Sequence, residues 1–109
     1  MAFLALASQK SLMSLQKNFL QFQYLSIMNQ IHYASSQMTA IQREYASSDA
    51  DCTEDADYIY YEDLSNQLET EKESIDSQLT AIENEISGLK TLVNKNIKSS
   101  CTLNLISRS

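Results

Sequence analysis

The side chains best suited to chemistry in this chain are a single histidine, two cysteines and a run of carboxylates. His32 lies between Ile31 and Tyr33, and no Cys, Asp or Glu stands at a catalytic or metal-ligand spacing from it. The chain contains no phosphate-binding glycine loop, no Gly-x-Ser-x-Gly elbow and no His-Glu-x-x-His motif. We therefore expect His32 to be a surface or interface residue in a protein that is not an enzyme.

The densest group of carboxylates lies in residues 49–57, which read Asp-Ala-Asp-Cys-Thr-Glu-Asp-Ala-Asp. A calcium-binding EF-hand loop requires glycine at its sixth position and a bidentate glutamate at its twelfth. Counted from Asp49, these positions hold Glu54 and Tyr60. We therefore predict no metal site and no cofactor, and interpret the segment as a solvated turn. Loose binding of a divalent ion is the remaining alternative.

Composition limits the folds that can position these residues. The chain has 109 residues with one glycine, no proline and no tryptophan, so it holds at most one domain and few turns. A β-sandwich, a barrel or a doubly wound sheet would need more turn residues than this. An all-α fold with few, long elements is therefore predicted.

The formal charge of −6 is distributed unevenly along the chain. Residues 1–46 carry +2, residues 47–57 carry −5, residues 58–98 carry −4, and Arg108 adds +1. No basic face is available to neutralise a row of phosphates, so we expect no nucleic-acid partner.

The first seven residues, Met-Ala-Phe-Leu-Ala-Leu-Ala, are apolar, and no positive charge precedes them. This is not the layout of a Sec signal peptide, and the run is too short to span a membrane. We expect no membrane span, and a protein that is either cytoplasmic or exported by a leaderless route.

Two long stretches show apolar residues at alternating steps of four and three, the pattern of a coiled-coil helix. The spacing predicts one helix over about 3–46 and a second over about 54–98, separated by an acidic turn at 47–53. Thr53 is the expected N-cap of the second helix. Residues 99–109 leave the pattern and are expected to form a flexible or docking tail.

The predicted fold is therefore a long antiparallel two-helix coiled-coil hairpin, a single unit over residues 1–109. At about 1.5 Å per residue, each helix would be roughly 60–65 Å long, with little interior of its own. The residues predicted to form the hairpin seam are Leu20, Tyr24, Ile27, Ile31, Met38, Ile41, Tyr45, Leu64, Leu68, Ile75, Leu79, Ile82, Ile86, Leu89 and Val93.

A single register brings most of these seam residues together. If the numbers of facing residues sum to 106, then Tyr45 faces Tyr61 and Met38 faces Leu68. Glu71, the acid predicted within the second seam, would then lie near the small side chain of Ala34.

The two cysteines lie far apart in this hairpin, with Cys52 at the turn and Cys101 at the open end. An intrachain disulfide is therefore not expected, because a bridge requires Cα atoms within about 7 Å. Two unpaired thiols are typical of a reducing compartment. A disulfide between the turn of one subunit and the open end of the next is the alternative.

The first helix has more apolar surface than the second can cover. Leu12, Leu15, Phe19 and Phe22 form a second stripe, which the apolar start extends toward Leu4. A row of glutamines, one every seven residues, flanks the first seam with uncharged amides. The predicted oligomer interface comprises Leu4, Leu12, Leu15, Phe19 and Phe22 together with Gln9, Gln16, Gln23, Gln30 and Gln37. Packing of the stripe beneath the C-terminal tail is the alternative.

Because soluble monomers rarely expose such a patch, the sequence predicts a non-enzymatic structural protein that self-assembles into a bundle, tube or filament. In fold alone, the hairpin resembles small leaderless secreted subunits such as type III secretion needle subunits and the WXG100 class. The Trp-x-Gly turn of the latter and the proline-containing turn of the former do not occur here. The alternative function is a hairpin adaptor or chaperone that binds a different helical protein.

Overall fold

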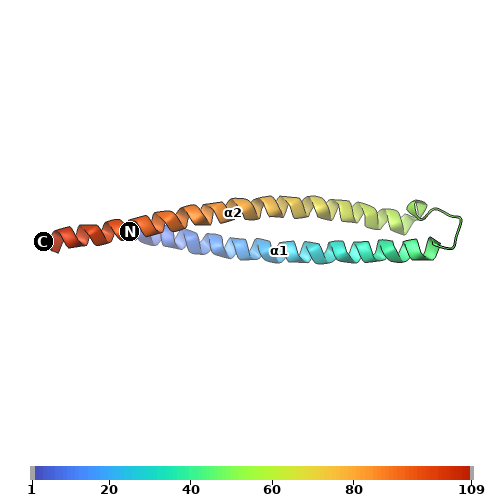
Figure 1. Cartoon of the computed structure of the whole chain (residues 1–109), viewed down its shortest axis with the longest axis horizontal. Helices are drawn as coiled ribbons and strands as arrows, with labels where there is room; N and C mark the ends of the chain where they lie inside the picture. The colour runs from blue at the N-terminus through green and yellow to red at the C-terminus, as the bar shows by residue number, and fades with distance from the viewer. Residues whose placement is uncertain (1, 109) are drawn as a thin grey trace. The chain divides into compact units, whose positions relative to one another are not determined.

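The computed structural model describes the backbone of residues 2–108 and the side chains of residues 5–95, 97 and 98. Helix α1 spans Ala2–Tyr45 and helix α2 spans Ala56–Arg108, and the loop between them contains a short 3-10 helix, η1, at Cys52–Glu54. Over residues 2–108 the backbone forms no strand. The predicted all-α, antiparallel two-helix hairpin is confirmed (Figure 1).

The chain packs as two compact units, each built from one stretch of α1 and one stretch of α2. Unit 1 combines Met1–Gln21 with Gln78–Ser109 and holds both ends of the chain. Unit 2 is the continuous segment Phe22–Ser77 and contains the connecting loop. Whether residues 1–109 behave as a single domain stays a prediction.

Side-chain caps end the loop and begin α2. The carboxylate of Asp51 accepts a hydrogen bond from the Thr53 backbone N–H at 3.0 Å and caps η1. Asp55 then caps α2, because its Oδ1 accepts from the backbone N–H groups of Asp57 at 2.8 Å and Tyr58 at 3.1 Å. The prediction that Thr53 is the N-cap is wrong: Thr53 lies inside η1, and the acid two residues later begins the helix.

Asp55 also ties the two helices of unit 2 together. Its other carboxylate oxygen accepts a hydrogen bond from the Tyr45 hydroxyl at 2.7 Å, at the last residue of α1. This bond and the backbone donors lower the pKa of the Asp55 carboxyl, and the same carboxylate raises the pKa of Tyr45. One residue therefore fixes both the start of α2 and its distance from α1.

The buried core is concentrated in unit 2. The buried apolar residues of the described chain are Ile27, Ala34, Ile41, Tyr58 and Leu68 in unit 2 and Ile82 in unit 1. Ala34 has no exposed surface at all, so its small side chain is completely covered. The predicted seam residues are all buried or half-buried.

Tyr58 is a core residue that the seam prediction does not include. It is buried in the first turn of α2, where its hydroxyl accepts a hydrogen bond from the Gln42 side chain at 3.4 Å. Its signal is present in the sequence, since Tyr58 precedes the seam position Tyr61 by three residues. The neighbouring run of tyrosines and acids concealed that spacing.

The predicted register is wrong by about six residues. Tyr45 contacts Asp55 rather than Tyr61, whereas the Tyr61 ring packs edge-on against Tyr33 with centroids 6.2 Å apart. Tyr45 with Asp55 in unit 2, and Lys17 with Glu83 in unit 1, have numbers that sum to 100. Because the seam repeats every seven residues, a slide of nearly one heptad still places apolar residues opposite one another.

The polar interruption of the second seam is also displaced by one residue. Glu71 is exposed, and Lys72 instead occupies the half-buried position between Leu68 and Ile75. The Lys72 ammonium reaches Glu69 at 3.3 Å, which raises the pKa of the lysine. A long aliphatic stem suits this position better than a carboxylate, because it covers apolar surface while its charge reaches water.

The second helix does not end near residue 98. α2 continues to Arg108, so residues 99–108 are helical and extend beyond the start of α1 (Figure 1). Residues 89–108 contain no glycine or proline to stop the helix, and adding a residue to an existing helix is far easier than starting one. The prediction that residues 99–109 leave the helical pattern is therefore wrong over residues 99–108.

Within the part of the chain that the structure describes, neither helix combines the length and the apolar character that a membrane span requires.

Candidate functional site

The most distinctive surface of unit 1 is an apolar stripe on α1. Leu12, Leu15 and Phe19 follow one another at steps of three and four, and 57–66% of each side chain is exposed. The predicted interface residue Leu4 is helical, but its side chain lies outside the described ones. Three large exposed apolar residues on two turns of helix form a surface suited to protein contact.

The part of α1 that belongs to unit 2 carries its own exposed apolar residues. Phe22, Leu25 and Tyr33 are 57–71% exposed. The predicted interface includes Phe22 but not Leu25, which follows Phe22 by three residues and was therefore detectable. On α2, Ile59 and Tyr60 are exposed as well.

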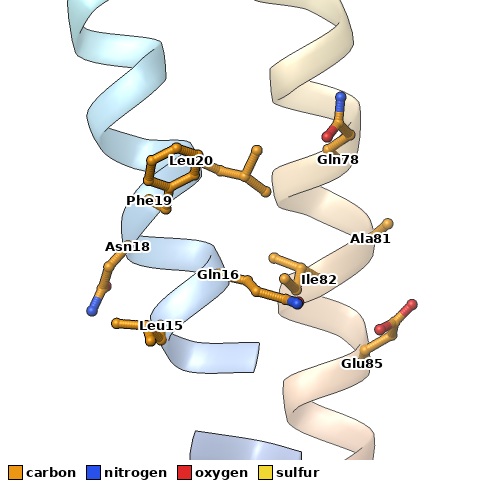
Figure 2. A pocket seen from close by; sticks show the side chains of 9 residues that line it. All are labelled: Leu15, Gln16, Asn18, Phe19, Leu20, Gln78, Ala81, Ile82 and Glu85. Atoms are coloured by element: carbon orange, nitrogen blue, oxygen red, sulfur yellow. The ribbon is translucent and has the colours of Figure 1, made fainter. Parts of the chain in front are cut away.

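A groove of about 950 Å³ lies between α1 and α2 within unit 1 (Figure 2). Leu20 and Gln16 point from α1 toward α2, where Ile82 lines the opposite wall, while Asn18 points away from α2. The residues that line the groove are Leu15, Gln16, Asn18, Phe19, Leu20, Gln78, Ala81, Ile82 and Glu85. The groove is thus mainly apolar, with amides and one carboxylate at its edge.

A second hollow, of about 490 Å³, adjoins the first. Leu15 and Asn18 line both of them, and Lys10 and Val93 line the second. Its wall is otherwise made of small side chains, namely Ala7, Ser11 and Ser14. The exposed Leu15 therefore stands between an apolar groove and a shallow hollow that includes a lysine.

The predicted glutamine row occupies mixed environments. In unit 1, Gln9 and Gln16 are exposed, and Gln16 lines the groove. In unit 2, Gln30 is exposed and donates to the Ser26 hydroxyl at 3.4 Å, whereas Gln23 and Gln37 are half-buried. These positions beside the seam would permit contacts with α2. The hydrogen bond of Gln30, however, stays within α1.

Polar contacts across the helices differ between the units. In unit 1, Lys17 forms an ion pair with Glu83 at 3.8 Å, with 33% and 52% of the two side chains exposed. In unit 2, the exposed Tyr33 and Tyr60 rings pack edge-on against the half-buried Tyr61. The Tyr33 hydroxyl is the main cause that raises the pKa of Tyr61.

The groups considered for chemistry remain dispersed. His32 is exposed on α1, Cys52 is a half-buried free thiol, and the Cys101 side chain lies outside the described ones. Among the described residues, no three His, Cys, Asp or Glu side chains come together as a metal-binding group.

Comparison of this chain with protein-family models, with curated proteins and with solved structures gives no match.

Proposed function

We propose that this protein is a non-enzymatic structural subunit that self-assembles through the apolar face of α1. The observation that carries the proposal is the exposure of Leu12, Leu15, Phe19 and Phe22, each at least 57% accessible. Burial of apolar surface contributes about 25 cal/mol per Å², so covering four such side chains is a substantial driving force.

The charge of α1 supports contact between copies. Over Ala2–Tyr45 the helix carries Lys10, Lys17 and Arg43 as its bases and Glu44 as its one acid. The residues beside the stripe are amides and hydroxyls rather than carboxylates. Another subunit can therefore approach this face without meeting a row of like charges, which is the usual obstacle to packing many copies of one chain.

The scarcity of fully buried side chains supports the same proposal. Unit 1 has one buried apolar residue, Ile82, among the described side chains. A two-helix arrangement leaves most of each helix wet, and small cores are usually completed by oligomerisation. Assembly would bury the surface that the fold itself leaves exposed.

The test is the assembly state of Phe19→Asp and Phe22→Asp, measured by size-exclusion chromatography with light scattering. Wild type is expected to form oligomers or polymers, and each variant to require at least tenfold more protein for the same assembly, because a buried unpaired carboxylate is costly. Helicity measured by circular dichroism should be retained, since both side chains are exposed within the chain.

Gln21→Asp is the matched control. It introduces the same charge between the two phenylalanines, at an exposed position that lies off the stripe. Assembly equal to wild type is expected for this control. Wild-type protein that stays monomeric at high concentration would rule out self-assembly.

The groove in unit 1 supports the alternative function, an adaptor or chaperone for a different helical protein. Its apolar walls, Leu20 and Ile82, are typical of sites that receive the apolar face of an amphipathic helix. In that case the protein alone would form a small defined oligomer and would bind its partner at fixed stoichiometry.

A further inference from the structure

The two units carry opposite side-chain charge. Unit 1 contains six basic and two acidic residues, a formal charge of +4. Unit 2 contains two basic and twelve acidic residues, a formal charge of −10. Two copies that meet through the same unit would therefore bring like charges together, whereas unit 1 against unit 2 brings opposite charges together.

Unit 1 has a surface that can receive a helix. The groove beside Phe19 has Ala81 on its α2 side, and Gly88 lies one heptad further along the same helix. A Cβ atom added at Gly88 would meet no atom within 4 Å, so the surface of α2 is uncovered at this small residue. Small side chains at such positions let a third helix come close to the pair.

Unit 2 has an α2 surface of matching chemistry. Ile59, Glu62 and Glu73 follow one face of the helix, and all three are exposed. Ile59 supplies apolar surface, and the two glutamates supply negative charge. Tyr60, also exposed, adds an aromatic ring next to this face.

We propose that the 56–77 stretch of α2 in one copy docks into the unit 1 groove of another copy. This inference rests on the proposed self-assembly and names the two surfaces that meet. Lys10 lines the hollow that adjoins the groove, while Lys90 and Lys95 are exposed on the same unit. Glu85 at the groove edge is the one lining carboxylate that opposes the contact.

A contact between two different surfaces has a definite consequence for assembly. After two copies dock, the pair still has one free groove and one free acidic face. The contact is therefore heterologous and propagates into a ring or a filament. Because opposite charges steer the encounter, assembly weakens as salt screens them over a Debye length of about 8–10 Å. Raising the salt from about 50 mM to about 500 mM should weaken association by roughly tenfold or more.

The decisive experiment uses two variants, each with one of the two surfaces blocked. Phe19→Asp blocks the groove of unit 1, and the pair Glu62→Lys with Glu73→Lys reverses the acidic face of unit 2. Each variant alone should require at least tenfold more protein than wild type to assemble, and should therefore be monomeric at a concentration where wild type assembles. Mixed in equal amounts, they should form a one-to-one pair, because the intact acidic face of the first docks on the intact groove of the second.

Native mass spectrometry of isotopically distinguished variants measures this pair. The pair Asp49→Lys with Glu54→Lys is the matched control, since it makes the same change in charge at exposed loop positions of unit 2. The control is expected to assemble at least tenfold more tightly than the α2 pair. Equal weakening by both pairs would overturn the assignment of the α2 surface.

Different results would rule out the docking surface and self-assembly itself. If the Glu62→Lys, Glu73→Lys variant assembles as well as wild type, the docking surface is wrong while self-assembly stands. If wild type is monomeric even at low salt, self-assembly itself is ruled out. Circular dichroism of each variant checks that the helices persist, and the substituted positions are exposed.

Discussion

The same two helices form both units, yet the units are held together in different ways. Unit 2 contains most of the buried side chains, and hydrogen bonds from Tyr45 to Asp55 and from Gln42 to Tyr58 link its helices. Unit 1 contains Ile82 as its buried apolar residue and a partly exposed ion pair between Lys17 and Glu83. The described side chains are therefore buried more deeply at the turn end than at the open end.

The two units also differ in the surfaces that they leave exposed. Unit 1 is basic and contains an apolar groove, whereas unit 2 is strongly acidic and exposes the rings of Tyr33 and Tyr60. A single uniform rod would have neither property. Packing and charge therefore differ between the two parts of this hairpin.

The largest expected effect comes from truncating the same residue type in each unit. Leu68 is 4% exposed in unit 2. The Leu68→Ala substitution should lower the free energy of unfolding by about 3 kcal/mol, because it leaves a buried cavity. Leu20 is half-buried at the groove of unit 1. The Leu20→Ala substitution should lower the free energy of unfolding by about 1 kcal/mol. Urea unfolding followed by circular dichroism measures both, and equal losses would contradict the proposed difference in packing.

A second test removes the polar link in unit 2. Asp55→Ala should lower the melting temperature by roughly 5 °C, because the helix loses its cap and Tyr45 loses its acceptor. Tyr45→Phe should have a smaller effect, since it deletes one hydrogen bond and leaves the cap intact. Equal melting temperatures for wild type and Asp55→Ala would show that this link does not stabilise the fold.

The same link should depend on pH at both extremes. The native pKa of Asp55 is lowered, so its contribution is present above the ordinary carboxyl pKa and is lost as pH falls through the native value. The native pKa of Tyr45 is raised, so its contribution is lost as pH rises through that value. The melting-temperature gap between wild type and Asp55→Asn should therefore narrow in acid, independently of the other carboxylates.

The smallest expected effect is an increase in stability from a substitution in unit 1. Gly88→Ala should raise the unfolding free energy by up to about 1 kcal/mol, because alanine favours the helix and its methyl group meets open space. The control Ser87→Ala, at the adjacent exposed position, should raise it by less. A loss of stability in Gly88→Ala would show that this face is more crowded than the structure indicates.

Much of the fold was predictable from local pattern. The four-three spacing predicted two long helices and the positions that turn inward, since side chains at these steps share one face of a helix whatever it packs against. The exposed stripe was predictable for the same reason, although Leu25 was overlooked. The helical residues 99–108 were missed because they have no strong pattern of their own. Tyr58 was missed because the neighbouring tyrosines and acids obscure its three-residue spacing from Tyr61.

The sequence by itself determined that this chain forms two amphipathic helices and that α1 has surplus apolar surface. Only the tertiary structure decided which heptad faces which, because a seven-residue repeat permits several registers of similar apolar content. The loop and the bonds of Asp55 select one of them by fixing where α2 begins relative to Tyr45. The groove between Leu20 and Ile82 follows from that selection, since a cavity depends on the side chains that meet rather than on the pattern of either helix alone.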